Sequence, residues 1–169
     1  MKKRQLFISI VLGVYLAALI PGVVMAAKPI DFLATGNVTV LEPVEYPDVF
    51  PAGNSGRWVV ASRYLAGELV GDIPGSFAFT MTYTANVKLP EEAGNLHGTL
   101  KMNGYTLKVN GKTGAVAEDT IRISGHWTFI EGAKGHGEFE AELVFDTSTG
   151  ELIPKLSLIQ LTGEWQPEG

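Results

Sequence analysis

The chain contains no cysteine among its 169 residues. This excludes disulfide bonds, thiolate metal ligands, cysteine nucleophiles and a lipid anchor on a cysteine. Basic residues are also scarce, with 13 Lys and Arg against 18 Asp and Glu, so the formal net charge is −5. A surface of this sign repels a phosphate backbone, and no basic stripe offsets it. Nucleic acid is therefore excluded as an expected partner.

Charge is absent between Arg4 and Lys28, and residues 6–20 form an uncharged apolar run. Basic residues come first, then the apolar run, and then Pro21-Gly22 with small residues, which is the layout of a secretory signal. The pattern predicts a cleaved signal peptide at 1–26 and a mature protein that starts at Ala27, in a secreted or periplasmic, extracytoplasmic location. The alternative is a retained membrane anchor, because about 20 apolar residues can cross a bilayer.

Residues 27–169 are expected to form a single domain. This segment holds 143 of the 169 residues, because 26 are removed with the signal. That length suits one domain with a core large enough to be stable without disulfide bonds or a structural metal. Three basic residues leave with the signal, so 10 basic residues face 18 acidic ones and the net charge becomes −8.

Helical spacing is missing from this domain, and alternation of apolar and polar residues takes its place. Alternation with a period of two predicts half-buried β-strands. A glycine-punctuated turn near Gly132 links two of the alternating segments into a hairpin over 118–139. The apolar faces of the three clearest strands are Phe77, Phe79, Met81 and Tyr83; Ile121, Ile123, Gly125, Trp127 and Phe129; and Phe139, Ala141, Leu143 and Phe145.

Weaker strands are expected at 35–42, 57–70, 96–109 and 155–165. Within 96–109 the apolar positions change from even to odd numbers around Asn103-Gly104, which predicts a bulge or a tight turn at Gly104.

The fold expected from these elements is all-β. Turn clusters at nearly regular intervals, with no amphipathic helix between them, indicate a meander of seven or eight adjacent antiparallel strands. Because no helix can cover the apolar face, we expect a single closed antiparallel barrel of about eight strands. A two-sheet sandwich is the alternative. The proline-rich stretch 42–56 is expected to be a loop across one mouth of the barrel.

Two segments resemble a known family. Glu118-Asp119-Thr120, the strand that follows, and Glu131-Gly132-Ala133-Lys134-Gly135 resemble the late hairpin of the allene oxide cyclase barrel and, more distantly, of dirigent proteins. The segment 67–75 is similar to the glycine-rich early strand and turn of such barrels. The resemblance implies a calycin-like barrel with an apolar cavity whose shape controls a cyclisation or a coupling. In the family a glycine-rich segment precedes the turn, and this chain has Ser124-Gly125-His126-Trp127 there instead. No catalytic residue is therefore carried over.

Histidines and acidic residues are the first candidates for chemistry. The three histidines, His97, His126 and His136, share parity with polar neighbours and are expected to face outward. Glu138, Glu140 and Glu142 recur on one strand face at about 7 Å. They could collect a hard cation such as calcium, but a charged outer face that keeps the barrel soluble is the preferred interpretation. No metal and no cofactor is expected.

The inward face is the remaining candidate site. An apolar pocket with few polar groups suits a small hydrophobic molecule. We expect such a ligand to contact Tyr64, Tyr83, Phe77, Phe79, Met81, Trp127, Phe129 and Phe139, with the two tyrosine hydroxyls as polar anchors; Gln160 is a further interior candidate. The alternative is that these side chains simply fill the barrel. The functional hypotheses are a binding protein without catalysis, a cofactor-free isomerase or cyclase, and a structural exoprotein.

Overall fold

The computed structural model describes residues 28–45 and 49–167. The expected signal segment 1–26 lies outside the described residues. Nine β-strands and no helix make up the described part, so no helix there is long or apolar enough to span a membrane. The strands are β1 (Ile30–Pro43), β2 (Val49–Pro51), β3 (Trp58–Gly71), β4 (Gly75–Asn86), β5 (Gly94–Met102), β6 (Tyr105–Ala117), β7 (Thr120–Glu131), β8 (Ala133–Val144) and β9 (Leu158–Pro167).

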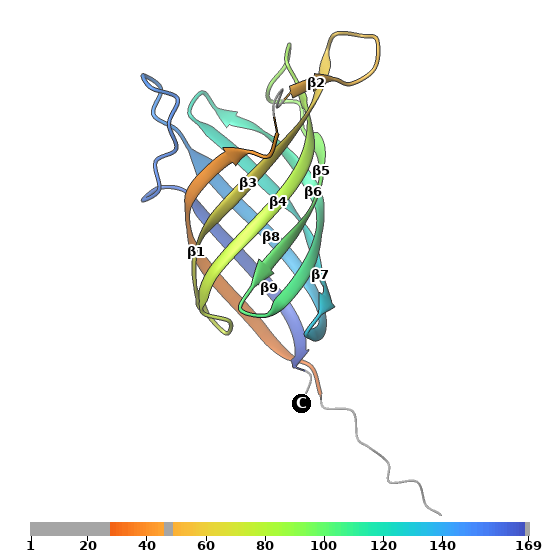
Figure 1. The fold of residues 1–169 in the computed structure, drawn as a ribbon, viewed down its shortest axis with the longest axis vertical. Helices are drawn as coiled ribbons and strands as arrows, with labels where there is room; N and C mark the ends of the chain where they lie inside the picture. Colours follow the sequence, from red (N-terminus) through yellow and green to blue (C-terminus); the bar gives the residue numbers. More distant parts are fainter. Residues whose placement is uncertain (1–27, 46–48, 168–169) are drawn as a thin grey trace, which may run out of the picture.

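The strands form a closed antiparallel barrel (Figure 1). Each strand from β3 to β9 pairs with the next one along the chain, and β1 pairs with both β9 and β3. The pairing of Ala34 with Gly71 and of Pro43 with Arg63 joins the first strand to the third and closes the cylinder. The predicted barrel of eight strands is therefore confirmed, with β2 as one further strand outside the ring.

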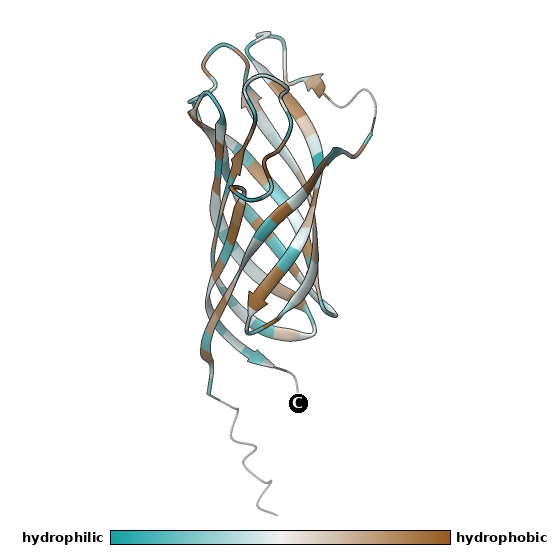
Figure 2. Cartoon of the chain, turned by 90° about the vertical axis from the view of Figure 1, so that its left-hand side faces the viewer, coloured by the Kyte–Doolittle hydropathy of each residue, from teal (hydrophilic) through white to brown (hydrophobic). Residues whose placement is uncertain are grey.

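The predicted faces of the three clearest strands are also confirmed. Phe79, Trp127 and Phe139 have no exposed surface, and the residues beside them in the chain are exposed or half-buried. Apolar and polar residues alternate along these strands (Figure 2). The three histidines are exposed as expected, and so are Glu138 and Glu140.

Two of the weaker predictions need correction. The predicted tight turn at Gly104 is confirmed, but it divides the segment 96–109 into two strands, β5 and β6. Both Asn103 and Gly104 in this turn have positive φ (42° and 83°). Glycine and asparagine tolerate this conformation best, which explains their use in a two-residue hairpin. The stretch 42–56 is not a plain loop, because Val49–Pro51 pairs with Val59–Ala61 and extends the wall upward.

The lower end of the barrel, where β1 starts and β9 ends, is filled by aromatic rings. The Trp127 ring lies 5.1 Å from Phe32 and 5.1 Å from Phe129 between centroids. The rings of Trp165 and Tyr105 extend the cluster, with centroids 5.8 Å apart. Edge-to-face contacts of this kind stabilise a core beyond the area that they bury. The cluster closes this end, so the barrel interior can open only at the other.

Glycines on the inward face let the strands bend tightly around these rings. A Cβ on Gly111 would lie 2.1 Å from the carbonyl oxygen of Ser124, and one on Gly137 would lie 1.9 Å from that of Thr162. Trp127 pairs directly with Gly137 in the register. Small residues opposite large ones allow a narrow barrel to pack without voids.

Candidate functional site

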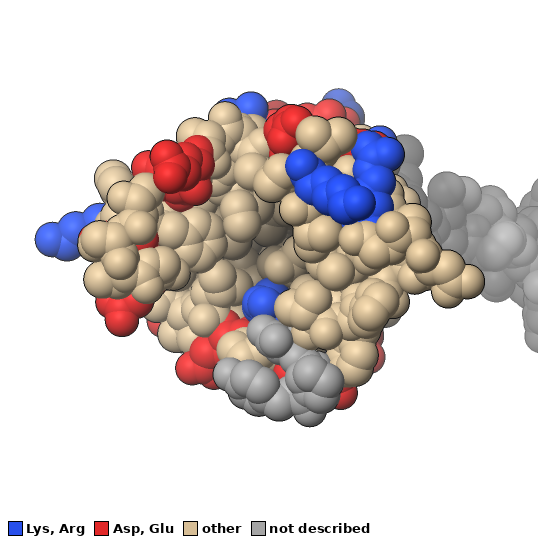
Figure 3. Space-filling model, turned by 90° about the horizontal axis from the view of Figure 1, so that it is seen from above, with Lys and Arg blue, Asp and Glu red and all other residues tan. Residues whose placement is uncertain are grey.

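The upper end of the barrel is hollowed, and a basic side chain is visible inside the hollow (Figure 3). This end carries β2, the β4–β5 loop and the β8–β9 loop (Figure 1). The strand register places five inward residues at this level, which we call the mouth residues: Leu41, Ala61, Arg63, Tyr83 and Leu96. The next inward residues toward the lower end are Leu65 on β3 and Met81 on β4, which are 0% and 3% exposed. The mouth therefore has a closed apolar floor.

Arg63 is the one charged residue at an inward position of the barrel strands that the structure describes. Alternation along β3 fixes its direction, because Ala61, Leu65 and Leu69 are all buried on the same face. Its cross-strand partners are Pro43 and Met81. The side chain is half-buried, and its Nη1 donates a hydrogen bond of 3.0 Å to the carbonyl oxygen of Ser62. A guanidinium thus lies where the filled core meets the open mouth.

Tyr83 lies on the same wall, on the neighbouring strand. It pairs with Ala61 and Leu96, is half-buried, and packs against the hydrophobic core. Its expected inward direction is confirmed. Its role as a polar anchor for a ligand stays a prediction.

Tyr64 does not point inward, and this prediction is wrong. Its neighbour Leu65 has no exposed surface, and alternation then turns Tyr64 to the outside, across from the exposed Thr80. Gln160 is also exposed, between the buried Ile159 and Leu161. In both strands the two faces carry apolar or aromatic residues, so the alternation in the sequence could not identify the inner one.

The other predicted ligand residues come together in the packed core. Each is at most 7% exposed, and all belong to one hydrophobic cluster: Phe77, Phe79, Met81, Trp127, Phe129 and Phe139. Ring contacts such as Phe79 to Phe139, 5.3 Å between centroids, occupy the space between them. A direct role in ligand contact stays a prediction; their evident role is to fill the barrel.

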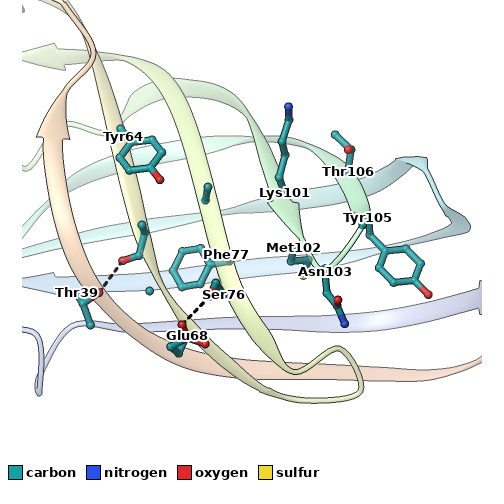
Figure 4. A pocket seen from close by; sticks show the side chains of 14 residues that line it. Thr39, Tyr64, Glu68, Ser76, Phe77, Lys101, Met102, Asn103, Tyr105 and Thr106 are labelled. Carbon is teal, nitrogen blue, oxygen red and sulfur yellow. Dashed lines mark hydrogen bonds between the residues drawn. The ribbon is translucent and has the colours of Figure 1, made fainter.

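A second concave region lies on the outer wall, with a volume of about 560 Å³ (Figure 4). Ala66 and Ala78 form its floor and Tyr64 flanks it. Its polar groups include Glu68, whose Oε1 accepts a 2.7 Å hydrogen bond from the Ser76 hydroxyl. The groove is open along the barrel surface and its one carboxylate is exposed. It suits a weakly held polar molecule better than a desolvated ligand.

The rim of the mouth is held by a small polar cluster. The Asn86 side chain is buried, donates a 2.7 Å hydrogen bond to Glu92 Oε2, and accepts from the backbone N–H groups of Lys88 and Leu89. The same Glu92 oxygen accepts from Arg57. These contacts connect the β4–β5 loop to the start of β3, so the rim next to the mouth residues is fixed in shape.

Other polar groups on the outer wall form cross-strand rows. His126 pairs with Asn110 on one side and Glu138 on the other, all on the exposed face. Arg122 makes a 2.6 Å ion pair with Glu142. Among the described residues, no group of three or more His, Cys, Asp or Glu is placed to hold a metal ion. These rows are typical of a solvated barrel exterior.

Comparison with known proteins gives no relative: no family model, no curated protein and no solved structure matches the chain. The resemblance to the allene oxide cyclase barrel therefore stays a prediction. The protein is a largely filled antiparallel barrel with one hollowed end.

Sequence reasoning missed Arg63. A signal for it was present, because Arg63 has the same odd parity as Ala61, Leu65 and Leu69. If the inner face of β3 is assigned from Leu65 and Leu69 instead of from Tyr64, Arg63 lies on that face.

Proposed function

We propose that this protein is an exported barrel that binds a small, largely apolar molecule in its upper mouth, without catalysis. The observation that carries the proposal is the hollowed upper end (Figure 3). Among the described residues, its inward positions are mostly apolar, with Arg63, Tyr83 and Thr113 as polar ones. Pockets with apolar walls and a few convergent polar groups are the usual form of small-molecule sites. Within the part of the barrel that the structure describes, the lower half is filled, so the mouth is where a ligand has room.

Export is supported by the signal-like segment 1–26. Native mass spectrometry of the protein purified from its host tests both parts of the proposal. The expected result is the mass of a chain that starts at Ala27, in a complex with one small molecule. A full-length chain found in the cytoplasm would contradict export, and a ligand-free spectrum from freshly purified protein would weigh against binding.

Filling the mouth should block binding. Ala85 pairs with Val59 on the inward face of β4 above Tyr83, so Ala85→Trp places an indole in the opening. We expect the affinity for the neutral fluorescent probe N-phenyl-1-naphthylamine to fall at least about tenfold, because the ring occupies the volume that the probe needs. Thr80→Trp adds the same ring to the outer face of β4 and should leave the affinity unchanged. Equal affinity of both variants for the probe would show that the probe binds outside the mouth.

Tyr83→Phe removes one hydroxyl and leaves the ring that packs on the core. We expect an unchanged fold and a loss of affinity for a polar-headed ligand of roughly fivefold, the effect of one hydrogen bond of about 1 kcal/mol. Titration calorimetry with the co-purified molecule measures it. Unchanged affinity would rule out the anchoring role.

A cofactor-free isomerase or cyclase is the second candidate. The observation that favours it is the presence of Arg63 and Tyr83 on one wall, since both can donate hydrogen bonds to a carbonyl oxygen and polarise it. Turnover of the co-purified molecule, followed by mass spectrometry over time, separates the two functions. Conversion to an isomer by the wild type but not by Tyr83→Phe would favour the enzyme.

A further inference from the structure

We propose that the groove on the outer wall is a second binding site and that its ligand is a neutral saccharide. The groove lies over β3, β4 and β5 (Figure 4), and its volume of about 560 Å³ falls within the range of roughly 300–1,000 Å³ that is usual for small-molecule sites. The site is on the outside of the barrel, so this inference does not depend on the ligand of the mouth.

The groove is concave because its floor consists of very small side chains. Ala66 and Ala78 pair across β3 and β4, and both are half-buried. Tyr64 lies one row above this pair on the same outer face, and Glu68 and Ser76 lie one row below it. Two methyl groups between rows of longer side chains leave a depression, and strand pairing holds its shape.

Hydrogen-bonding side chains surround the floor. Thr39, Glu68, Lys101 and Asn103 lie around the groove and come from β1, β3, β5 and the β5–β6 turn (Figure 4). The Ser76 hydroxyl donates a 2.7 Å hydrogen bond to Oε1 of Glu68, which orients the carboxylate. A carboxylate has about four lone-pair sites, so the exposed Glu68 can also accept hydrogen bonds from a ligand.

The charges of the lining favour a neutral ligand. Glu68 and Lys101 are the one acidic and the one basic residue among the described residues that line the groove. They lie two strands apart, roughly 10 Å across the sheet, whereas the two charged groups of an α-amino acid are attached to one carbon. None of the described lining residues belongs to the large apolar side chains that the barrel exposes. A lipid or an apolar protein surface therefore fits less well than a neutral polar molecule.

A sugar ring matches an apolar floor with a polar rim. Its C–H groups form an apolar face, and its hydroxyls surround the edge as donors and acceptors. The C–H face fits on the methyl groups of Ala66 and Ala78, beside the ring of Tyr64, where weak C–H contacts with an aromatic ring add to the packing. The hydroxyls then meet Glu68 as an acceptor and Lys101 as a donor. Because the groove is open to solvent, we expect a Kd on the order of 1 mM.

The groove and the mouth are separated by packed core. Leu65 and Phe79 pair on the inner face between the rows of Tyr64 and Ala66, and neither has exposed surface. A saccharide in the groove and an apolar molecule in the mouth should therefore bind independently.

The test is a heteronuclear NMR titration with the methyl glycosides of glucose, galactose, mannose and N-acetylglucosamine, each up to about 50 mM, well above the expected Kd. At least one glycoside should shift the backbone amide resonances of Ala66, Glu68 and Ala78 in a saturable way. Glycine carries both charges without the ring, and cyclohexanol has a ring with a single hydroxyl. Neither should shift these resonances.

Variants identify the residues that hold the sugar. Ala78→Tyr fills the floor and should weaken binding at least about tenfold. Ser124→Tyr adds the same side chain to the exposed face of β7 and should leave the affinity unchanged. Glu68→Gln keeps the shape of the side chain and should weaken binding roughly fivefold, because an amide oxygen accepts weaker hydrogen bonds than a carboxylate.

The absence of a saturable shift with any of the four glycosides would overturn the inference. Equal shifts with glycine, or shifts confined to mouth residues such as Ala61 and Ala85, would also overturn it. Unchanged affinity in both Ala78→Tyr and Glu68→Gln would show that the sugar binds elsewhere. If Ala78→Tyr does not fold, Glu68→Gln decides, because Glu68 is exposed. Saturation of the mouth with N-phenyl-1-naphthylamine should leave sugar binding unchanged, and failure of that probe to bind would count against the proposed function alone.

Discussion

Replacing Trp127 with alanine is expected to lower the free energy of unfolding by about 3–5 kcal/mol. The ring is completely buried at the centre of the aromatic cluster, and its Nε1 donates a 3.1 Å hydrogen bond to the carbonyl oxygen of Thr162. Alanine removes the ring contacts with Phe32 and Phe129 and leaves a cavity in a region that the bent strands cannot collapse around. It also leaves the Thr162 carbonyl without this donor.

Urea denaturation followed by far-ultraviolet circular dichroism measures this change, since fluorescence loses its main reporter in the variant. Thr128→Ala is the matched control, because Thr128 is the next residue of β7 and is exposed. It should change stability by no more than about 0.5 kcal/mol. Trp127→Phe keeps an aromatic ring at this position, so its loss in free energy of unfolding should lie between those of Trp127→Ala and Thr128→Ala. A loss below about 1 kcal/mol in Trp127→Ala would show that the interior is not packed around this residue.

Gly111→Ala is expected to destabilise the barrel by about 3 kcal/mol or more, although it adds a single methyl group. The new Cβ would lie 2.1 Å from the Ser124 carbonyl oxygen and 2.8 Å from the Gly125 Cα, both backbone atoms of β7. These atoms cannot move aside without separating two paired strands. The substitution therefore loosens the β6–β7 ladder where it bends over the core.

Gly114→Ala on the same strand provides the control. Its Cβ would meet nothing closer than 3.3 Å, the Ala93 Cα, and its φ is not in the left-handed region. We expect a change within about 1 kcal/mol, because small adjustments relieve the contact and alanine lowers the entropy of the unfolded chain. Thermal unfolding of both variants compares them directly. Equal melting temperatures would contradict the tight bend at Gly111.

The sequence predicted the fold wherever one strand face was clearly polar. Along β4 and β7 the inner positions are aromatic or aliphatic and the outer ones carry Thr, Ser, Arg or His, so alternation was enough. Closure was harder to predict, because it depends on the pairing of the first strand, β1, with the last, β9, which lie at opposite ends of the described chain. The choice of a barrel over a sandwich came from the absence of a helical cover, and the register of the closing strands came only from the structure.

The candidate site was harder to predict than the fold. In β9 the outer face carries Leu158, which is 52% exposed, so the sequence shows apolar residues on both faces. Gln160 was therefore assigned to the inner face, although it lies on the outer one. In β3 Tyr64 was expected to face inward, whereas the buried Ala61 and Leu65 put the odd-numbered residues, Arg63 among them, on that face.

A crystal structure of the protein grown with N-phenyl-1-naphthylamine tests the central proposal most directly. We predict that the probe lies in the upper mouth beside Ala85, with the core below unchanged. A probe bound in the outer groove beside Tyr64, or a mouth that stays empty at a saturating concentration of the probe, would contradict it.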